Sequence, residues 1–208
     1  MKNYMLSGLV LLLLMLMMQG AFAQKRIYLA PDDHTDYMWT ADEATYENAF
    51  LTMTDYYLDR MDATEGNAPP YQARWNADGS FWMWIYQKNR TAPQFQRLIK
   101  RINDGHFSMP LNALVLSNGG TPAEAVLRGM YYPGLIQRAY GVDFPIAIAM
   151  ENQTLPYGLS SLWAGSGAKY SWKGVCGCAS HVPHLSTRDR ETYYVGGRDG
   201  SRILMKWN

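Results

Sequence analysis

Apolar residues recur at helical spacing in several stretches of the chain. Between residues 46 and 61, large apolar side chains return at steps of three and four, which places them on one face of a helix. Residues 95–102 repeat this spacing. Two Thr-x-x-Glu sequences, ending at Glu43 and Glu124, are typical of capping boxes that begin a helix. The pattern predicts helices over 40–62, around 95–102 and from 121 onward, with further helices at 131–140 and 159–165.

Shorter apolar runs between these helices predict strands. Residues 142–150 are nearly all apolar, as expected for a strand covered on both faces, and the aromatic segment 75–86 fits either a strand or a helix. Strands that alternate with helices indicate a mostly parallel sheet, open or closed into a barrel, with ligands at the carboxyl ends of the strands. The remaining strands are predicted at 25–30, 106–109 and 168–172, and in a hairpin of 192–195 and 202–206 around Asp199-Gly200.

The first 23 residues are typical of a secretory signal peptide. Lys2 precedes a short Leu- and Met-rich run, and Ala21-Phe22-Ala23 has the small-x-small form of a cleavage site. An apolar run of roughly a dozen residues is too short to span a bilayer. We therefore expect export to the periplasm or the medium without membrane insertion, and a single domain over residues 24–208.

Charge and aromatic content restrict the partners. Without Lys2, basic and acidic residues are equal in number, so the chain lacks the basic surplus that nucleic acids and anionic membranes require. The 15 Tyr and 7 Trp suit the stacking of sugar rings, although such residues are also ordinary core residues. Cys176 and Cys178 are too close in sequence for an unstrained disulfide, and we expect two thiols.

The segment after the first predicted strand contains the strongest metal-binding pattern. His34 and Asp36 are two residues apart, so their side chains project to the same side of an extended chain. An imidazole and a carboxylate form a half-site for Zn²⁺ or another divalent metal. The acidic residues Asp32 and Asp33 support a competing interpretation, in which this segment is an exposed acidic turn. His181 and His184 also have a metal-compatible spacing, but the proline between them favours a loop.

The segment from Pro31 to Trp39 resembles the start of the catalytic domain in the α-mannosidases of glycoside hydrolase family 38. The family sequence Pro-His-Ser-His-Asn-Asp-Pro-Gly-Trp matches Pro31, His34, Asp36 and Trp39 here. The resemblance implies that His34 and Asp36 bind a catalytic zinc and that Trp39 lines the sugar subsite. It also implies a seven-stranded (β/α) barrel of the glycoside hydrolase and deacetylase type, and a mannose-containing glycan as substrate.

Weaker similarities extend to the hairpin, and three departures accompany them, of which the smallest is Asp32 in place of the family's first histidine. Residues 154–157 resemble the segment before the family's next helix, which makes Tyr157 a second substrate-binding residue. The family's nucleophile is an aspartate, but residues 108–113 contain no carboxylate, and Asn112 is the best polar candidate there. Glu151, after the apolar strand, is the alternative carboxylate. The family's general acid and remaining zinc ligand follow the hairpin, so the resemblance implies a partial barrel.

These observations leave three functions open. The first is a secreted, metal-dependent glycoside hydrolase that resembles α-mannosidases. The second is a non-catalytic remnant or fragment of such an enzyme that binds carbohydrate. The third is a metal-dependent polysaccharide deacetylase, since deacetylases with a related barrel also use Asp and His at strand ends. The helix-borne His pair of the deacetylases is not evident in this sequence.

Overall fold

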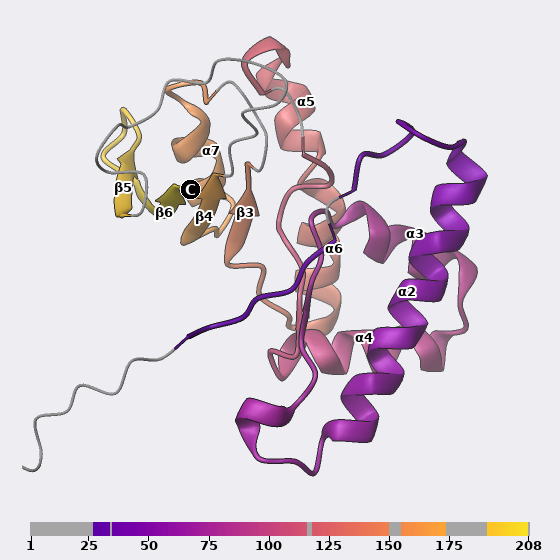
Figure 1. The fold of residues 1–208 in the computed structure, drawn as a ribbon. Helices are drawn as coiled ribbons and strands as arrows, with labels where there is room; N and C mark the ends of the chain where they lie inside the picture. The colour runs from indigo at the N-terminus through magenta and orange to yellow at the C-terminus, as the bar shows by residue number, and fades with distance from the viewer. Residues whose placement is uncertain (1–26, 34, 116–117, 150–154, 174–190, 208) are drawn as a thin grey trace, which may run out of the picture.

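The computed structural model describes residues 27–33, 35–115, 118–149, 155–173 and 191–207. These residues form a mixed α/β structure with a helical group at one end and a small sheet at the other (Figure 1). In chain order the elements are α2 (Glu43–Thr64), η1 (Pro69–Tyr71), β1 (Trp75–Asn76), α3 (Phe81–Asn89), α4 (Ala92–Asn103), β2 (Phe107–Ser108), η2 (Asn118–Gly120), α5 (Ala123–Arg128), α6 (Tyr131–Tyr140), β3 (Ile146–Ile148), α7 (Leu159–Gly165), β4 (Tyr170–Lys173), β5 (Thr192–Gly196) and β6 (Arg202–Trp207).

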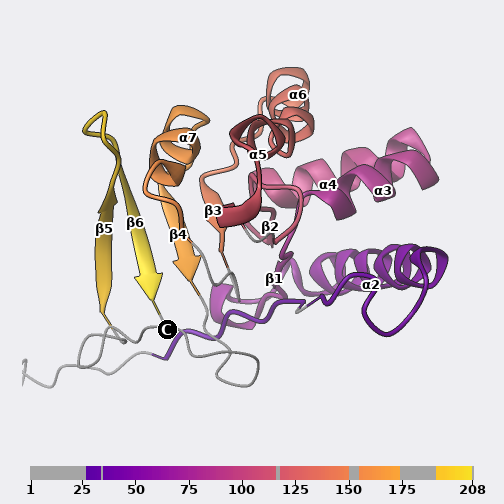
Figure 2. The ribbon, with the colours of Figure 1, turned by 90° about the horizontal axis from the view of Figure 1, so that it is seen from above.

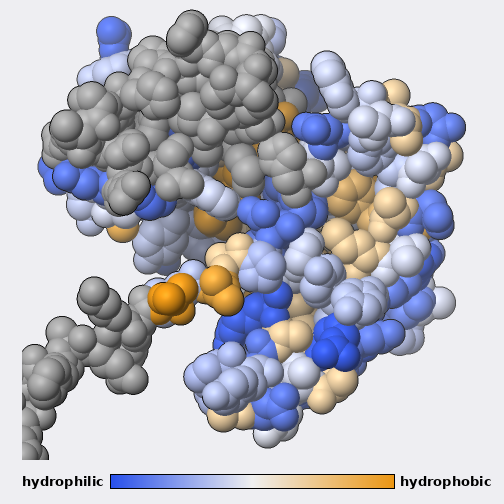
Figure 3. All heavy atoms as spheres, viewed as in Figure 1, coloured by the Kyte–Doolittle hydropathy of each residue, from blue (hydrophilic) through white to orange (hydrophobic). Residues whose placement is uncertain are grey.

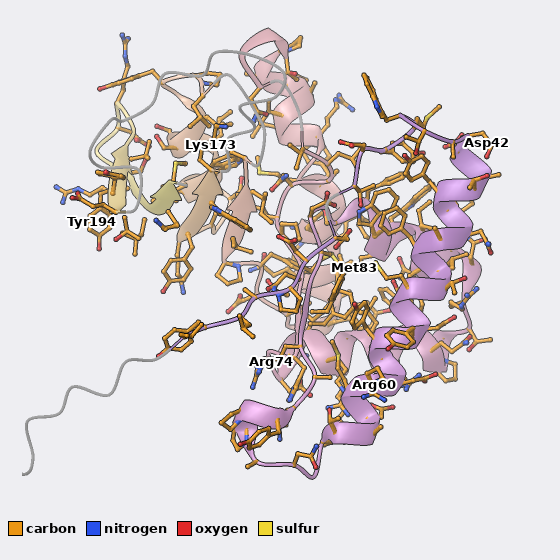
Figure 4. The ribbon with its side chains drawn as sticks, viewed as in Figure 1. Asp42, Arg60, Arg74, Met83, Lys173 and Tyr194 are labelled. Atoms are coloured by element: carbon orange, nitrogen blue, oxygen red, sulfur yellow. The ribbon has the colours of Figure 1, made fainter. Side chains whose placement is uncertain are left out.

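Helices α2, α3 and α4 pack beside strands β1 and β2 and enclose the larger part of the core (Figures 1 and 2). The predicted helix over 40–62 is present as α2, and its buried residues include Phe50, Leu58 and Met61. The aromatic segment 75–86 contains both elements, because β1 and α3 divide it. Met83 of α3 is fully buried at the centre of this group (Figure 4).

Both predicted capping boxes are wrong. Helix α2 has Asp42 as its N-cap, two residues after Thr40, and the carboxylate of Asp42 accepts a hydrogen bond from the backbone N–H of Thr45 at 2.8 Å (Figure 4). Thr40 instead bonds the hydroxyl of Tyr46 through its own hydroxyl. Helix α5 has Pro122 at its N-cap and no side-chain cap. At α2, aspartate is a strong N-cap residue and satisfies a free N–H of the first turn, so Thr40 is not needed there.

Two short sheets follow one another across the molecule. Strands β1 and β2 pair in parallel, and the second sheet has the order β3-β4-β6-β5, in which only β5 is antiparallel. The backbone N–H of Leu111, just beyond β2, donates to the carbonyl of Ile146 in β3 at 2.7 Å. The carboxyl ends of the parallel strands therefore lie along one edge of the molecule.

The strand predictions are correct in part. Residues 27–30 of the predicted first strand are not in a strand, and pairing is limited to a single parallel bridge between Asp32 and Asn76. In the described part of 142–150 only Ile146–Ile148 form a strand. The hairpin around Asp199-Gly200 is present as β5 and β6. The strands that the structure describes do not close into a barrel, so the seven-stranded barrel is not observed among them.

The four-stranded sheet has one covered face and one open face. Val195, Ile203 and Met205 face α7, which packs on β5 and β6. Tyr170 and Tyr194 both pair in register with Leu204, so they lie on the opposite face, where they are 49% and 68% exposed. Figure 4 shows the side chain of Tyr194 at the edge of the sheet. Aromatic residues on an uncovered sheet face are compatible with further structure or a ligand packing there.

The described residues on the face shown in Figure 3 are mostly polar. The clearest apolar feature of this face is the described N-terminal segment, where Ile27 and Leu29 are each 87% exposed. Among the described helices, none combines the length and the apolar character needed to cross a bilayer. The predicted signal peptide lies outside the described residues.

Candidate functional site

The segment from Asp33 to Asp36 lies at the carboxyl edge of the sheets and is fixed there by β1. The backbone N–H of Asp33 donates to the carbonyl of Asn76 at 3.3 Å. The backbone N–H of Thr35 donates to Oδ2 of Asp78, two residues beyond β1, at 2.9 Å. The segment is therefore bound to β1 on both sides of position 34.

Asp33 and Asp78 form a buried pair of carboxyl groups. Asp33 is 9% exposed and Asp78 is 6% exposed, and their side chains lie within hydrogen-bonding reach. Burial, together with the negative charge of Asp78, raises the pKa of Asp33 to about 8. Asp33 therefore keeps its proton at neutral pH in the folded chain, whereas an ordinary aspartate does not. The exposed acidic turn expected at Asp32 and Asp33 is wrong for Asp33.

Asp78 was missed by the sequence analysis. Its Oδ1 accepts a hydrogen bond from the indole N–H of Trp82 at 3.0 Å, in addition to the bond from Thr35. Asp78 becomes a site candidate only when residues 75–76 are assigned as a strand, because a carboxylate just beyond a parallel strand lies at the ligand-binding edge. That strand has only two residues, which is too short for a period-two pattern.

Asp36, the predicted metal ligand in the described part of this segment, is exposed and borders a pocket. The pocket has a volume of about 310 Å³ and is lined by Asp33, Thr35, Asp36, Thr40, Tyr46, Ala49, Phe50 and Met53. His34 lies outside the described residues. Within the described ranges, no three His, Cys, Asp or Glu side chains come together to hold a metal ion. Of the two aspartates that line the pocket, Asp33 is buried and Asp36 is exposed.

Trp39 projects into solvent beside the same segment. Its backbone N–H donates to the carbonyl of Asp36 at 3.0 Å, which closes a tight turn. Met38 in this turn has φ of 62°, the left-handed region that a non-glycine side chain rarely adopts. Trp39 is 81% exposed. The strained turn thus presents an indole ring near Asp36 without burying it, which suits contact with a ligand.

Asn112 lies at the carboxyl edge as predicted, but its side chain bonds to the backbone. Its Oδ1 accepts from the backbone N–H of Ile148 at 2.8 Å, and its Nδ2 donates to the carbonyl of Leu114 at 3.0 Å. The amide thereby joins the segment after β2 to β3, so the contacts of Asn112 indicate a structural role.

Tyr157 lies away from this segment. Its ring is 5.9 Å from the guanidinium carbon of Arg198, in the turn between β5 and β6. It lines a separate pocket of about 260 Å³ beside α7. Because that turn precedes β6, it marks the amino end of the parallel strands. Glu151, Cys176, Cys178, His181 and His184 lie outside the described residues.

The fold and the site define a class: an α/β protein with a mostly parallel sheet and acidic side chains at the carboxyl edge. Solved structures similar in fold to this chain include a protein of glycosyl hydrolase family 38 and an α-mannosidase, both from Enterococcus faecalis. The first is 14% identical with a TM-score of 0.58 over 89% of this chain, and the second is 14% identical with a TM-score of 0.66 over 88%. The chain spans about a fifth of their lengths, 19% and 20% respectively.

The likeness establishes a fold similar to domains of family 38 enzymes. No family model matches the sequence, and no curated protein matches it. At this identity the likeness concerns the fold, and the function has to be argued from the side chains at the carboxyl edge.

Proposed function

We propose that this chain is part of a glycoside hydrolase that resembles the α-mannosidases and acts on mannose-containing glycans. The observation that carries the proposal is the likeness in fold to the two family 38 structures, over nearly nine-tenths of the chain. The segment that resembles the family's metal-binding sequence lies at the carboxyl edge, where α/β proteins bind ligands.

In the proposed site, His34 and Asp36 would hold a divalent metal such as zinc. Imidazole and carboxylate donors suit zinc, and Asp36 borders an open pocket. When bound, the metal supplies a positive charge that binds sugar hydroxyls and stabilises charge in the transition state. Trp39 packs against the sugar ring, and its exposed indole costs no rearrangement on binding. Glu151 is the proposed carboxylate beside the substrate.

A second proposed function is carbohydrate binding without catalysis. Asn112 occupies the region where the family has its nucleophile, and an amide cannot form a glycosyl ester. Its oxygen already accepts a hydrogen bond from Ile148, and its nitrogen donates to Leu114. These contacts favour a chain that retains a sugar-binding edge but lacks the nucleophile.

Calorimetry and a turnover assay on the chain without its predicted signal peptide separate these functions. We expect one equivalent of Zn²⁺ to bind, and His34→Ala to weaken binding at least tenfold. The double variant His181→Ala/His184→Ala is the matched control and should bind zinc as the wild type does. Hydrolysis of aryl α-mannosides supports the hydrolase, whereas binding of mannose without hydrolysis supports the second function. A chain that binds neither zinc nor mannose contradicts both.

Export is a further part of the proposal. It rests on the sequence of residues 1–23. Expression in a bacterium with a periplasm, followed by N-terminal sequencing of the periplasmic fraction, should identify Gln24 as the first residue. Full-length protein in the cytoplasm would contradict it.

A further inference from the structure

A second pocket lies beside α7, away from the segment around Asp36. It has a volume of about 260 Å³ and is formed where α7 packs on β5 and β6. Its walls include the apolar side chains of Leu155, Leu159, Trp163, Val195, Ile203 and Met205. None of its lining residues belongs to the pocket that Asp36 borders. The two pockets therefore have independent chemistry.

Ser160 contributes a buried hydroxyl group to the pocket beside α7. The residue lines the pocket and is 4% exposed, and its Oγ has no hydrogen-bond partner among the residues that the structure describes. A buried polar group without a partner lowers the stability of the folded chain. A bound molecule that hydrogen-bonds to this oxygen would remove that cost. The hydroxyl of Ser160 therefore indicates a ligand with one matching polar group.

The rim of the pocket is held in place by hydrogen bonds between α7 and the turn that joins β5 to β6. The hydroxyl of Ser161 donates to Oδ1 of Asp199 at 2.8 Å, and the hydroxyl of Ser201 donates to the same oxygen at 2.6 Å. A side chain at Gly197 would clash with the hydroxyl of Ser161, so glycine permits this close approach. The pocket is therefore preformed, which reduces the entropy cost of binding a ligand.

Aromatic and sulfur-containing side chains of the pocket favour an aromatic ligand. Tyr157 lines the pocket with a side chain that is 73% exposed, and its ring lies 5.9 Å from the guanidinium carbon of Arg198. The walls contain the indole of Trp163 and the thioether of Met205. Aromatic rings attract one another in stacked and edge-to-face arrangements, and sulfur makes favourable contacts with ring edges.

The size and polarity of the pocket restrict the ligand to one ring with one polar group. An apolar cavity of about 150 Å³ accommodates benzene. The pocket of about 260 Å³ therefore has room for a six-membered ring with a small substituent. A sugar carries hydroxyl groups around its ring, and most of them would lose water against these apolar walls without gaining a partner.

We propose that the pocket beside α7 binds a small phenol. The ring of the phenol packs against Leu159, Trp163 and Met205, and its hydroxyl group forms a hydrogen bond with Oγ of Ser160. The site lies near the turn between β5 and β6, at the amino end of the parallel strands. It goes beyond the proposed function and does not depend on it, because it uses neither the metal-binding segment nor a sugar.

The first experiment titrates the purified protein with phenol and follows it by NMR. The indole N–H signal of Trp163 and the methyl signals of Ile203 should shift and saturate, with a dissociation constant of about 1 mM or lower. The indole signal of Trp39 is the internal control and should not move. Mannose should not displace phenol. Shifts of equal size at Trp39, displacement by mannose, or no binding of phenol would overturn the inference.

Ser160→Ala isolates the hydrogen bond to the ligand. Its affinity for phenol should fall about fivefold or more, whereas its affinity for toluene, which has a methyl group in place of the hydroxyl, should not fall. The variant should be at least as stable to urea as the wild type, because it removes a buried hydroxyl group that has no partner. Unchanged phenol affinity, or a clear loss of stability, would overturn the inference.

Val195→Phe and Leu204→Phe are matched variants that test the position of the site. Val195 lines the pocket, whereas Leu204 pairs with Tyr194 and lies on the open face of the sheet. The larger side chain at position 195 should fill the pocket and lower phenol affinity at least tenfold. Leu204→Phe should bind phenol as the wild type does. Equal affinities of the two variants for phenol would overturn the inference.

Discussion

Two clusters of buried charge occur in the described residues, and they are built in opposite ways. In the helical group, the fully buried side chain of Arg101 bonds three carboxylates, with distances of 2.6 Å to Asp62, 2.9 Å to Glu65 and 2.9 Å to Asp104. At the carboxyl edge, Asp33 and Asp78 bring two acidic groups together, which would repel each other if both were ionised, and the pKa of Asp33 is raised. Opposite charges that satisfy one another are typical of a structural network, whereas a pair of like charges is typical of a functional site.

The pKa values show the same contrast. Burial raises the pKa of Asp62, but hydrogen bonds from Arg101 and Arg97 outweigh it and hold that pKa below its usual range. Burial and the charge of Asp78 act together on Asp33 and raise its pKa. The stability contributed by Asp62 is present above its unfolded pKa and is lost as the pH falls. The raised pKa of Asp33 lowers stability as the pH rises from about 4 to about 8.

The largest expected change in the free energy of unfolding tests the ion-pair network around Arg101. Arg101→Met should lower the free energy of unfolding by about 3 kcal/mol, because the three carboxylates lose the cation that they share. Urea unfolding followed by circular dichroism measures this change. Lys100→Met is the matched control, since its pair with Glu65 is 60% and 51% exposed, and it should cost less than about 1 kcal/mol. Equal losses for the two variants would show that burial does not distinguish these ion pairs.

The next largest effect tests the Asp33–Asp78 pair through the pH dependence of the free energy of unfolding. In the folded chain Asp33 stays protonated up to about pH 8, but in the unfolded chain it ionises near pH 4, so folding takes up a proton between these values. Asparagine at this position takes up none. The free energy of unfolding of Asp33→Asn, relative to that of the wild type, should therefore be about 2 kcal/mol higher at pH 7 than at pH 5. Urea midpoints at both pH values, with a chelator present, measure the gain.

The control for this experiment comes from the other cluster. Asp62→Asn removes a carboxylate whose pKa is lowered, so its difference from the wild type should be nearly constant between pH 5 and pH 7. Parallel pH curves for Asp33→Asn and the wild type would contradict the raised pKa of Asp33.

The two regions also differ in how far the sequence predicts them. The helical spacing from Tyr46 to Met61 and from Phe95 to Ile102 correctly predicts α2 and α4, because each buries one face over several turns. Arg101 lies within the second of these stretches, and its burial depends on acidic residues of α2 more than 30 positions away. Hydrophobic periodicity describes one helix at a time and does not predict ion pairs between distant segments, so the ion-pair network of Arg101 was not predicted.

At the carboxyl edge the sequence predicts little of the side-chain contacts. Asp36 follows the single bridge between Asp32 and Asn76, but residues 27–30 of the predicted strand before it do not form a strand. Asp78 was missed because β1 has only two residues, and the burial of Asp33 was missed because it depends on contact with Asp78. Asn112 was identified from its polarity, but its bonds to Ile148 and Leu114 require the pairing of two distant strands.

A smaller effect extends the comparison to an uncharged polar group at the carboxyl edge. Asn112→Ala leaves the backbone N–H of Ile148 without its acceptor and should lower the free energy of unfolding by about 1–2 kcal/mol. Asn112→Asp retains the acceptor and should restore part of this loss. Zinc affinity should be unchanged in Asn112→Ala. A loss of zinc binding with unchanged stability would instead place Asn112 among the metal ligands.

The smallest effect on stability, and the sharpest test of function at the carboxyl edge, is expected for Trp39→Ala. Because Trp39 is 81% exposed, its removal should change the free energy of unfolding by less than about 0.5 kcal/mol. If its ring packs against a sugar, affinity for mannose in calorimetry should fall about tenfold, which corresponds to about 1.4 kcal/mol. Tyr194→Ala is the matched control, since Tyr194 is 68% exposed on the open face of the sheet. Equal losses of affinity in both variants would mean that sugar binding is not localised at Trp39.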